Sequence, residues 1–493
     1  MALIDLNIPA GVYRNGTDLQ AMGRWRDANL VRWIDNTMRP VGGWRTRSDT
    51  AANAAIRGML AWDDNNNDRW LVGGTYNKLY VWGIDGTQYD ITPSGFTAGR
   101  EDAAAFTGYG GNLYGSYAYG VARPETSRIQ AATSWALDNW GENLIACTED
   151  DGKIYEWALS TGTPAAVVAN APVNNRSIVV TEERFLFALG AGGNPRLVQW
   201  SDREDNTTWT PSATNEAGDL ELSTSGQIMA GVSVRGQTLI LTSTDAHVAN
   251  YIGPPYVYGI ERVGSACGLA GNKAVATVDA GAFWMGAYSF FGYTGGGVQE
   301  MQSDVADYVF NDINRAQISK TFAVVNSAFG EIWWFYPSGG STENDRYVAY
   351  NYVENTWYIG QLARTAGVSR GAFRYPIWAS ADDNKVYEHE VGYEYGSLSP
   401  FAETGPISIS SGDQVMSVTD LLPDEKTQGD VTATFKARFY PNGTERSYGP
   451  YSLSNPTSVR FTGRQIRLRV EGQRLADWRV GVNRIDVTPG GRR

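Results

Sequence analysis

Histidine and cysteine, the side chains that most often carry out catalysis or bind metals, are scarce in this sequence of 493 residues. It contains two histidines, His247 and His389, and two cysteines, Cys147 and Cys267. No Cys-x-x-Cys or His-Glu-x-x-His spacing occurs, so a zinc site is not indicated. His389 lies between two glutamates, and strand alternation would place it on the face opposite to both. We therefore expect no catalytic histidine, no metal and no cofactor, and we interpret the cysteines as small buried apolar residues.

Carboxylates are the reactive groups that the sequence supplies in number. Paired acids occur at Asp63-Asp64, Glu182-Glu183 and Asp382-Asp383, and a glycoside hydrolase needs two carboxylates that face each other. Neighbouring residues of a strand point to opposite faces, however, and acids near turns are usually solvated. The triglycine Gly295–Gly297 lacks the Lys-Ser/Thr pair of a phosphate-binding loop. The sequence thus favours a protein that is not an enzyme, and it leaves open one that binds or cleaves glycans.

Five tryptophans stand out because they could stack on sugars or nucleic-acid bases. Large aromatic side chains also fill cores and subunit interfaces, and we favour this second interpretation. The five are Trp25, Trp33, Trp44, Trp333 and Trp334.

Composition indicates strands and turns as the elements that must position these residues. Gly 56, Trp 17 and Tyr 27 are high, and charged residues make up only 19% of the chain, which favours β structure over helices. No apolar run approaches the roughly 18 residues of a membrane span, and the N-terminus lacks a basic start and an apolar signal core. We expect synthesis in a reducing cytoplasm, without membrane insertion or secretion by the usual route.

Charge is unevenly distributed along the chain. Of the formal −12, residues 460–493 hold +6 and residues 1–49 hold +2, which leaves −20 on residues 50–459. An acidic body argues against a dedicated nucleic-acid binder. It is compatible with DNA that passes the surface without binding to it.

A repeated pattern of short strands predicts a β-propeller. Lys78–Trp82 and Lys153–Trp157 both read Lys, apolar, Tyr, any residue, Trp, and Asn384–Glu390 is a third version. Strand sets about 40 residues apart are typical of propeller blades. We expect six or seven blades between residues 50 and 395, with an extended array of β-sandwiches as the alternative. Less regular units occupy residues 176–200, 226–251, 271–293 and 321–357.

Three further regions complete the expected organisation. Residues 1–49 form an N-terminal arm with a hairpin across Asn36-Thr37, which lies outside the blades and could share a sheet with the C-terminus. A Gly/Tyr-rich insertion at about 92–128 interrupts the blade pattern, and residues 304–315 are the best helical candidate. Residues 396–493 read as an antiparallel, sandwich-like platform. Its expected strands are 414–421, 431–440, 458–461, 465–470, 477–480 and 485–487.

Both chain ends and the centre carry segments that are distinctive. At the start these are Ile8–Thr17, Gly23–Trp33 and Arg39–Arg45; in the centre they are Trp200–Asp202, Trp209–Pro211 and Ala217–Leu220; at the end they are Tyr440–Glu445, Tyr448–Tyr451 and Gly463–Arg469. The sequence resembles, through these segments, the tail nozzle (tail hub, or packaged-DNA stabilisation) proteins of short-tailed bacteriophages. The insertion at 92–128 has no counterpart in that resemblance.

The resemblance implies a structural role in the virion tail. It implies a homohexameric ring that docks on the portal and its adaptor proteins, binds a needle or plug, and supports tailspikes or fibres. Double-stranded DNA would pass through the ring without sequence-specific binding. Ring contacts need surfaces rich in aromatics and arginine, and both chain ends supply them. The interface candidates are Arg24, Trp25, Arg26, Arg32, Trp33, Trp44, Arg464, Arg467 and Arg469.

Overall fold

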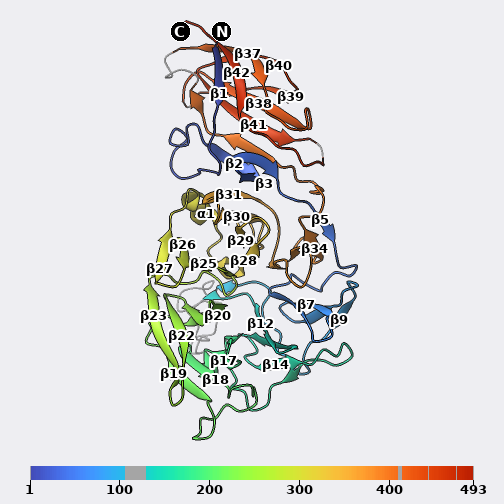
Figure 1. Ribbon diagram of the computed structural model, residues 1–493, viewed down its shortest axis with the longest axis vertical. Helices are drawn as coiled ribbons and strands as arrows, with labels where there is room; N and C mark the ends of the chain where they lie inside the picture. The colour runs from blue at the N-terminus through green and yellow to red at the C-terminus, as the bar shows by residue number, and fades with distance from the viewer. Residues whose placement is uncertain (1, 106–128, 409–413, 442, 474, 492–493) are drawn as a thin grey trace, which may run out of the picture.

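The chain folds into a β-propeller and a β-sandwich platform stacked along one long axis (Figure 1). The computed structural model describes residues 2–105, 129–408, 414–441, 443–473 and 475–491. Most of the Gly/Tyr-rich insertion, residues 106–128, lies outside the described residues. Its base is a two-stranded pair, β10 (Ala104–Ala105) with β11 (Ile129–Gln130).

The propeller has seven blades, each a four-stranded antiparallel sheet, in the described part of the chain. The first strands of successive blades contact one another all the way round, so the ring is closed and is not an extended array of sandwiches. The strands, blade by blade, are β6 (Met59–Asp63), β7 (Arg69–Gly74), β8 (Leu79–Trp82), β9 (Gln88–Asp90); β12 (Trp135–Trp140), β13 (Asn143–Thr148), β14 (Ile154–Trp157), β15 (Ala166–Val167); β16 (Ser177–Val180), β17 (Leu186–Leu189), β18 (Leu197–Trp200), β19 (Gly218–Glu221); β20 (Ile228–Val234), β21 (Gln237–Thr242), β22 (Asp245–Gly253), β23 (Val257–Ser265); β24 (Val275–Val278), β25 (Gly281–Met285), β26 (Phe290–Tyr293), β27 (Val298–Met301); β28 (Phe322–Asn326), β29 (Glu331–Tyr336), β30 (Arg346–Asn351), β31 (Thr356–Gln361); β32 (Ala366–Val368), β33 (Ile377–Ala379), β34 (Val386–His389) and β5 (Trp44–Thr46).

The repeated motif of the sequence marks the same place in three blades. Its copies form the third strands β8, β14 and β34. The last motif position holds Trp82 and Trp157 in the first two blades and His389 in the seventh, and all three side chains are buried. Sequence similarity therefore reflects an equivalent core position, which is how a propeller repeat arises.

The seventh blade combines strands from two distant segments of the chain. β5 pairs with β34 in the register Arg45↔Glu388 and supplies the fourth strand. The arm predicted for residues 1–49 therefore ends at about residue 43, because residues 44–46 belong to the seventh blade. Pairing a strand from before the first blade with three from after the sixth closes the ring and leaves no blade incomplete.

The platform is a sandwich of two antiparallel sheets. Alternate residues of β38 and β41 face inward, and Phe435 of one sheet packs on Phe461 of the other with 4.8 Å between ring centroids. The expected strand at 477–480 forms only bridges through Val480, whereas an edge strand, β39, was not expected. The sheets contain β1 (Ala2–Leu6), β42 (Asn483–Pro489), β37 (Met416–Leu422) and β40 (Thr457–Gly463), and β2 (Trp25–Asn29), β35 (Phe401–Thr404), β41 (Gln465–Gly472), β38 (Val431–Arg438) and β39 (Arg446–Ser452), with β36 (Ile407–Ser408) beside β41.

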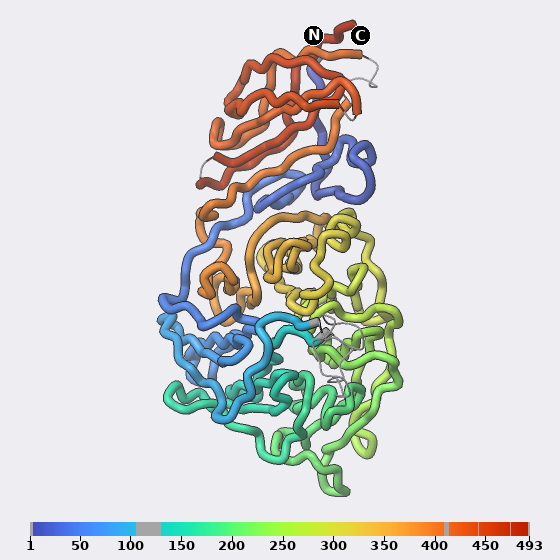
Figure 2. Tube along the Cα trace, turned by 180° about the vertical axis from the view of Figure 1, so that it is seen from behind, coloured from blue at the N-terminus to red at the C-terminus, as the bar shows by residue number. Residues whose placement is uncertain are grey.

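Both chain ends lie in this platform, as Figure 2 shows from behind. β1 pairs with β42 and β2 with β35, so each sheet contains an N-terminal strand. The hairpin joins β3 (Val31–Ile34) to β4 (Thr37–Pro40). Its turn is Asp35-Asn36, one residue earlier than expected, and both residues have positive φ, 49° and 59°. A tight hairpin turn of this kind needs positive φ at both central residues, which Asp and Asn tolerate.

The platform rests on the outer edge of the sixth blade. β2 lies against β31, and the Val12 amide donates to the Trp357 carbonyl at 2.7 Å. The Leu30 amide donates to the Tyr347 hydroxyl at 2.8 Å. Beside this junction is α1 (Ala306–Asp312), shorter than the predicted helix at 304–315. These contacts join the two parts through buried hydrogen bonds as well as through the connecting chain.

Candidate assembly interface

Both histidines are buried and packed within propeller blades. His389 fills the blade-core position that tryptophan fills elsewhere, and its ring stacks on Trp378 at 4.0 Å between centroids. Arg364 Nε donates to His389 Nε2 at 2.9 Å, so the imidazole is an acceptor and neutral. Burial first, and Arg364 second, holds the pKa of His389 well below its usual value. His247 is also buried, with Nε2 3.3 Å from Asp245 Oδ1, and burial lowers its pKa.

We expect His389 to make stability depend on pH. The unfolded chain binds a proton near the ordinary histidine pKa of about 6.5, whereas the folded chain does so only at lower pH. The unfolded state therefore binds more protons below pH 6.5, and stability falls as pH falls through that window. His389→Gln keeps an acceptor for Arg364 but does not titrate. The free energy of unfolding in urea, measured between pH 5 and 7, should therefore depend less steeply on pH in this variant than in the wild type. The same pH dependence of stability in the variant and the wild type would show that His389 is not its source.

The paired acids are tied to separate turns. Asp64 accepts from the amides of Asn66 and Asp68 and from Trp70 Nε1 at 2.8–3.0 Å. Glu183 accepts from the Tyr258 hydroxyl, and Asp383 from the Tyr387 hydroxyl. No pair presents two free carboxylates to one point. In the described residues, no group of three or more His, Cys, Asp or Glu side chains could hold a metal ion.

A buried ionic centre joins the N-terminal arm to the propeller. Arg32 of β3 is 1% exposed and lies 2.8 Å from Glu331, in the sixth blade, and 2.5 Å from Glu390, just after β34. Trp333 Nε1 and the Tyr358 hydroxyl donate to Glu331 at 2.9 and 2.7 Å. Burial disfavours the guanidinium, but the two carboxylates outweigh it and raise the pKa of Arg32.

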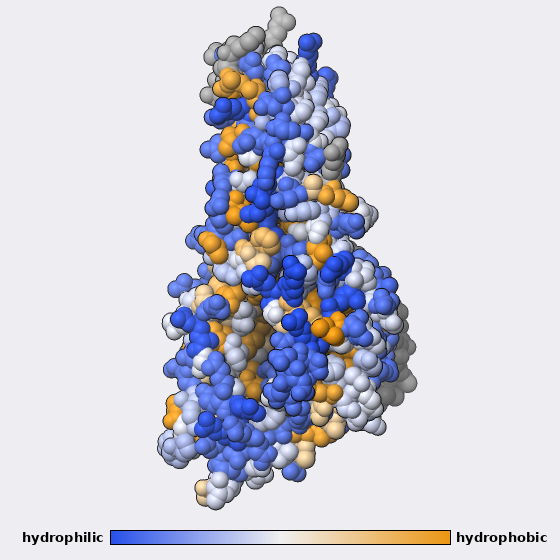
Figure 3. Space-filling view, turned by 45° about the vertical axis from the view of Figure 1, so that its right-hand side comes forward, coloured by the Kyte–Doolittle hydropathy of each residue, from blue (hydrophilic) through white to orange (hydrophobic). Residues whose placement is uncertain are grey.

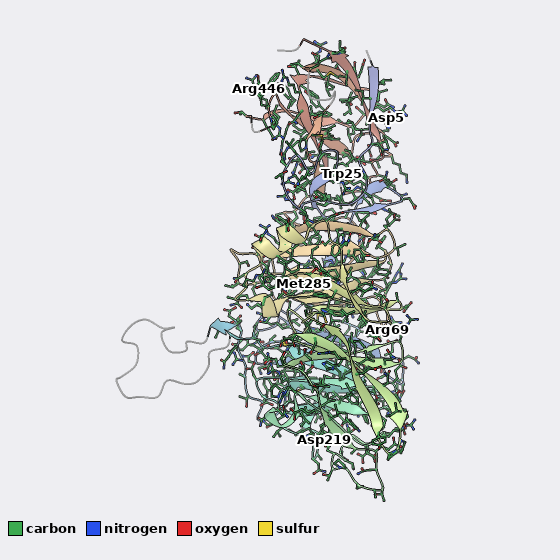
Figure 4. All side chains as sticks on the ribbon, turned by 90° about the vertical axis from the view of Figure 1, so that its left-hand side faces the viewer. Asp5, Trp25, Arg69, Asp219, Met285 and Arg446 are labelled. Carbon is green, nitrogen blue, oxygen red and sulfur yellow. The ribbon has the colours of Figure 1, made fainter. Side chains whose placement is uncertain are left out.

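Several of the predicted interface residues make their contacts inside the subunit. Trp25, Arg32 and Trp33 are buried, and Trp25 lies between the upper platform and the propeller, as its label shows in Figure 4. Trp25 and Trp33 pack together at 5.8 Å between centroids. Trp44 lies against His389 and Tyr395 in the seventh blade. Trp25, Arg32 and Trp33 hold the fold together and are not available to another subunit, which corrects the prediction for these three, whereas Trp44 is half-buried.

A charged network fastens the loop before β2 to the platform sheet. Asp18 pairs with Arg26 at 3.0 Å, with Arg438 at 3.1 Å and with Arg467. Arg467 also lies 3.0 Å from Glu445. Arg469 pairs with Glu471 at 3.1 Å and stacks on the Phe401 ring. Of the predicted arginines, Arg26, Arg467 and Arg469 therefore lie in this part of the platform, and most of their charge is satisfied inside the subunit.

The same network places exposed apolar side chains on one edge of the platform. Leu19 follows Asp18 directly and is 43% exposed, and Met22 is equally exposed. Tyr440, two residues after Arg438, is 62% exposed, and Arg464 lies over its ring at 5.5 Å. Arg24 is half exposed beside Asp304. We call Leu19, Met22, Arg24, Tyr440 and Arg464 the platform edge.

Figure 3 shows another face of the molecule, which is mostly hydrophilic with small, separate apolar groups. Aromatic and arginine side chains that remain exposed are typical of protein interfaces. Sequence reasoning named Arg24 and Arg464 but missed Leu19, Met22 and Tyr440. Tyr440 could have been predicted from the sequence, because a large aromatic residue at the start of the turn Tyr440–Gly443 indicates an exposed aromatic side chain.

No family model matches this sequence, and no curated protein matches it significantly. Solved β-propellers are similar in fold. Virginiamycin B lyase from Staphylococcus aureus has a TM-score of 0.43 and 8% identity, covering 70% of this chain and 99% of the lyase. The Neurospora crassa Pan2 WD40 domain has a TM-score of 0.41 and 7% identity, covering 73% and 97%. These likenesses concern the propeller and say nothing about activity here. None of the described helices is long and apolar enough to cross a membrane.

Proposed function

We propose that this chain is a virion structural protein, the subunit of a homohexameric tail nozzle in a short-tailed bacteriophage. The nozzle docks on the portal–adaptor complex, retains packaged DNA together with a needle or plug, and conducts DNA during ejection. The role is mechanical, and no bond is made or broken. This proposal extends the resemblance of the chain ends and centre to nozzle proteins.

The observation that carries the proposal is the N-terminal arm that spans both parts of the subunit. Residues 2–46 give a strand to each platform sheet and a strand to the seventh blade. Arg32, midway along the arm, bonds carboxylates of the propeller. A subunit stiffened in this way can transmit force along its long axis, as the wall of a tube under DNA pressure must. The −20 charge of residues 50–459 favours a bore that does not retain phosphates.

The alternative, a propeller that cleaves glycans, lacks a suitable carboxylate pair. Two cavities in the propeller channel are lined, among the described residues, by one carboxylate, Asp138. Glycoside hydrolysis by the usual route needs two carboxyl groups within roughly 5–9.5 Å of each other. Cleavage of bacterial polysaccharide by the purified monomer would support this alternative over the nozzle.

The platform edge supplies a direct test of assembly. Tyr440→Asp places a charge in the expected contact and should weaken ring formation at least about tenfold, a typical effect at an interface hot spot. Sedimentation of the wild type and variant over a concentration series measures this. Tyr256→Asp is the matched control, because Tyr256 is 76% exposed at the tip of the β22–β23 hairpin, away from the platform. Equal assembly of wild type and Tyr440→Asp would exclude the platform edge as the contact.

A further inference from the structure

A small basic cavity lies in the central channel of the propeller. It has a volume of about 150 Å³ and is bounded by the inner strands and the segments that lead into them. This is several times the roughly 30 Å³ that one water molecule occupies in the liquid. Its polar side chains come from five blades and from η2 (Ile318–Lys320), just before the sixth. They include Arg57, Ser134, Lys273, Lys320, Thr321 and Thr365.

Two of the three cations in this cavity have carboxylate partners. Arg57 lies 2.6 Å from Glu343, and Lys320 lies 2.6 Å from the same carboxylate. Lys320 also lies 2.5 Å from Asp102, at the base of the insertion. The positive charge of these two side chains is therefore largely balanced.

Lys273 is the exception. Its ammonium group forms no hydrogen bond or ion pair with the described residues. Asp138, which lines the neighbouring cavity together with Lys273, acts on it only through longer-range attraction. The side chain is half-buried, and burial lowers its pKa to about 8, with Asp138 opposing the shift. An anion in the cavity would supply the missing counter-charge.

Two threonines of the cavity lining also have hydroxyl groups without hydrogen-bond partners. Thr321 Oγ1 and Thr365 Oγ1 are buried, at 0% and 3% residue exposure, and neither makes a hydrogen bond in the structure. Buried polar groups are nearly always hydrogen-bonded, because their desolvation is otherwise uncompensated. The backbone at Lys273 bridges that at Phe322, the neighbour of Thr321, so the ammonium and one hydroxyl come from adjoining segments.

We propose that this cavity binds an oxyanion of phosphate size. Lys273 supplies the charge, Thr321 and Thr365 turn their hydroxyl groups to donate hydrogen bonds, and Arg57 and Lys320 remain paired with Glu343. The ligand would connect the fifth, sixth and seventh blades, next to the seam where the ring closes. This inference is independent of the proposed function, because it concerns the interior of one subunit.

Inorganic phosphate, with sulfate as a second probe, tests the proposal by titration calorimetry against a chloride background. We expect saturable binding of one phosphate per chain. Lys273→Met should weaken it at least tenfold and Thr365→Val severalfold, whereas Lys78→Met, on the surface of the first blade, should leave it unchanged. Binding should also weaken as pH rises above 8 and Lys273 loses its proton.

Absence of saturable phosphate binding to the wild type would overturn the proposal and would mean that water satisfies the two threonines. Equal affinity in the wild type and Lys273→Met would overturn it too. Competition by AMP would show that the cavity accepts a phosphate carried by a nucleotide. Phosphate binding without such competition would identify the free ion as the ligand.

Discussion

Replacing Arg32 with methionine is expected to lower the free energy of unfolding by about 3–5 kcal/mol, the cost of removing one partner from a buried ion pair. The substitution keeps much of the side-chain volume but leaves Glu331 and Glu390 without their cation. Both carboxylates are buried or nearly so, and burial already raises the pKa of Glu331. Urea unfolding followed by tryptophan fluorescence measures the loss.

Arg45→Met is the matched control, since Arg45 pairs with Glu388 while its own side chain is 62% exposed. Exposed ion pairs contribute about 0–1 kcal/mol, so its effect should be small. Adding Glu331→Gln to Arg32→Met should restore part of the stability, because it removes one unpaired charge. An Arg32→Met protein as stable as Arg45→Met would show that the ionic centre does not join arm and propeller.

Replacing Trp378 with alanine is expected to destabilise the protein by about 3–5 kcal/mol and to loosen the ring seam. Trp378 is fully buried in β33 and contacts His389, Trp333 and Phe335, at 4.0, 5.4 and 5.4 Å between centroids. The cavity left behind lies beneath β34, the strand on which β5 pairs. Hydrogen exchange of the β5 amides should therefore accelerate more than exchange in the third blade.

Tyr256→Ala serves as the control for this loss of an aromatic ring, because exposed positions usually change stability by no more than about 0.5 kcal/mol. If Trp378→Ala accelerated exchange equally in all blades, unfolding would be global. The seam would then not be the site at which the ring opens first.

The propeller could be predicted from sequence because its blades repeat. The Lys-x-Tyr-x-Trp motif recurs at the third strand, so a periodic signal survived even where His389 replaced tryptophan. Blade number could not be settled, because β5 lies more than 300 residues before the strand it pairs with. Such a distant pairing leaves no local pattern. The platform edge strand β39 was missed because its alternation is weak, with exposed residues on both faces.

The interface candidates show where composition misleads. Arginine and tryptophan at the chain ends indicated an exposed contact surface, but Arg32, Trp25 and Trp33 lie inside. Their partners, Glu331 and Glu390 among them, are some 300 residues away in the sequence and gave no local cue. Deleting residues 1–45 would remove Arg32 and most of β5 as well as any contact surface, so single exposed substitutions are the sharper test of assembly.

The central proposal is that this chain forms one wall segment of a six-fold tube. Single-particle imaging of the purified protein mixed with the portal–adaptor complex tests it most directly. The nozzle role predicts a ring of six copies seated on the adaptor, with neighbouring platforms in contact. Isolated monomers that leave the adaptor unoccupied at saturating concentration would contradict it.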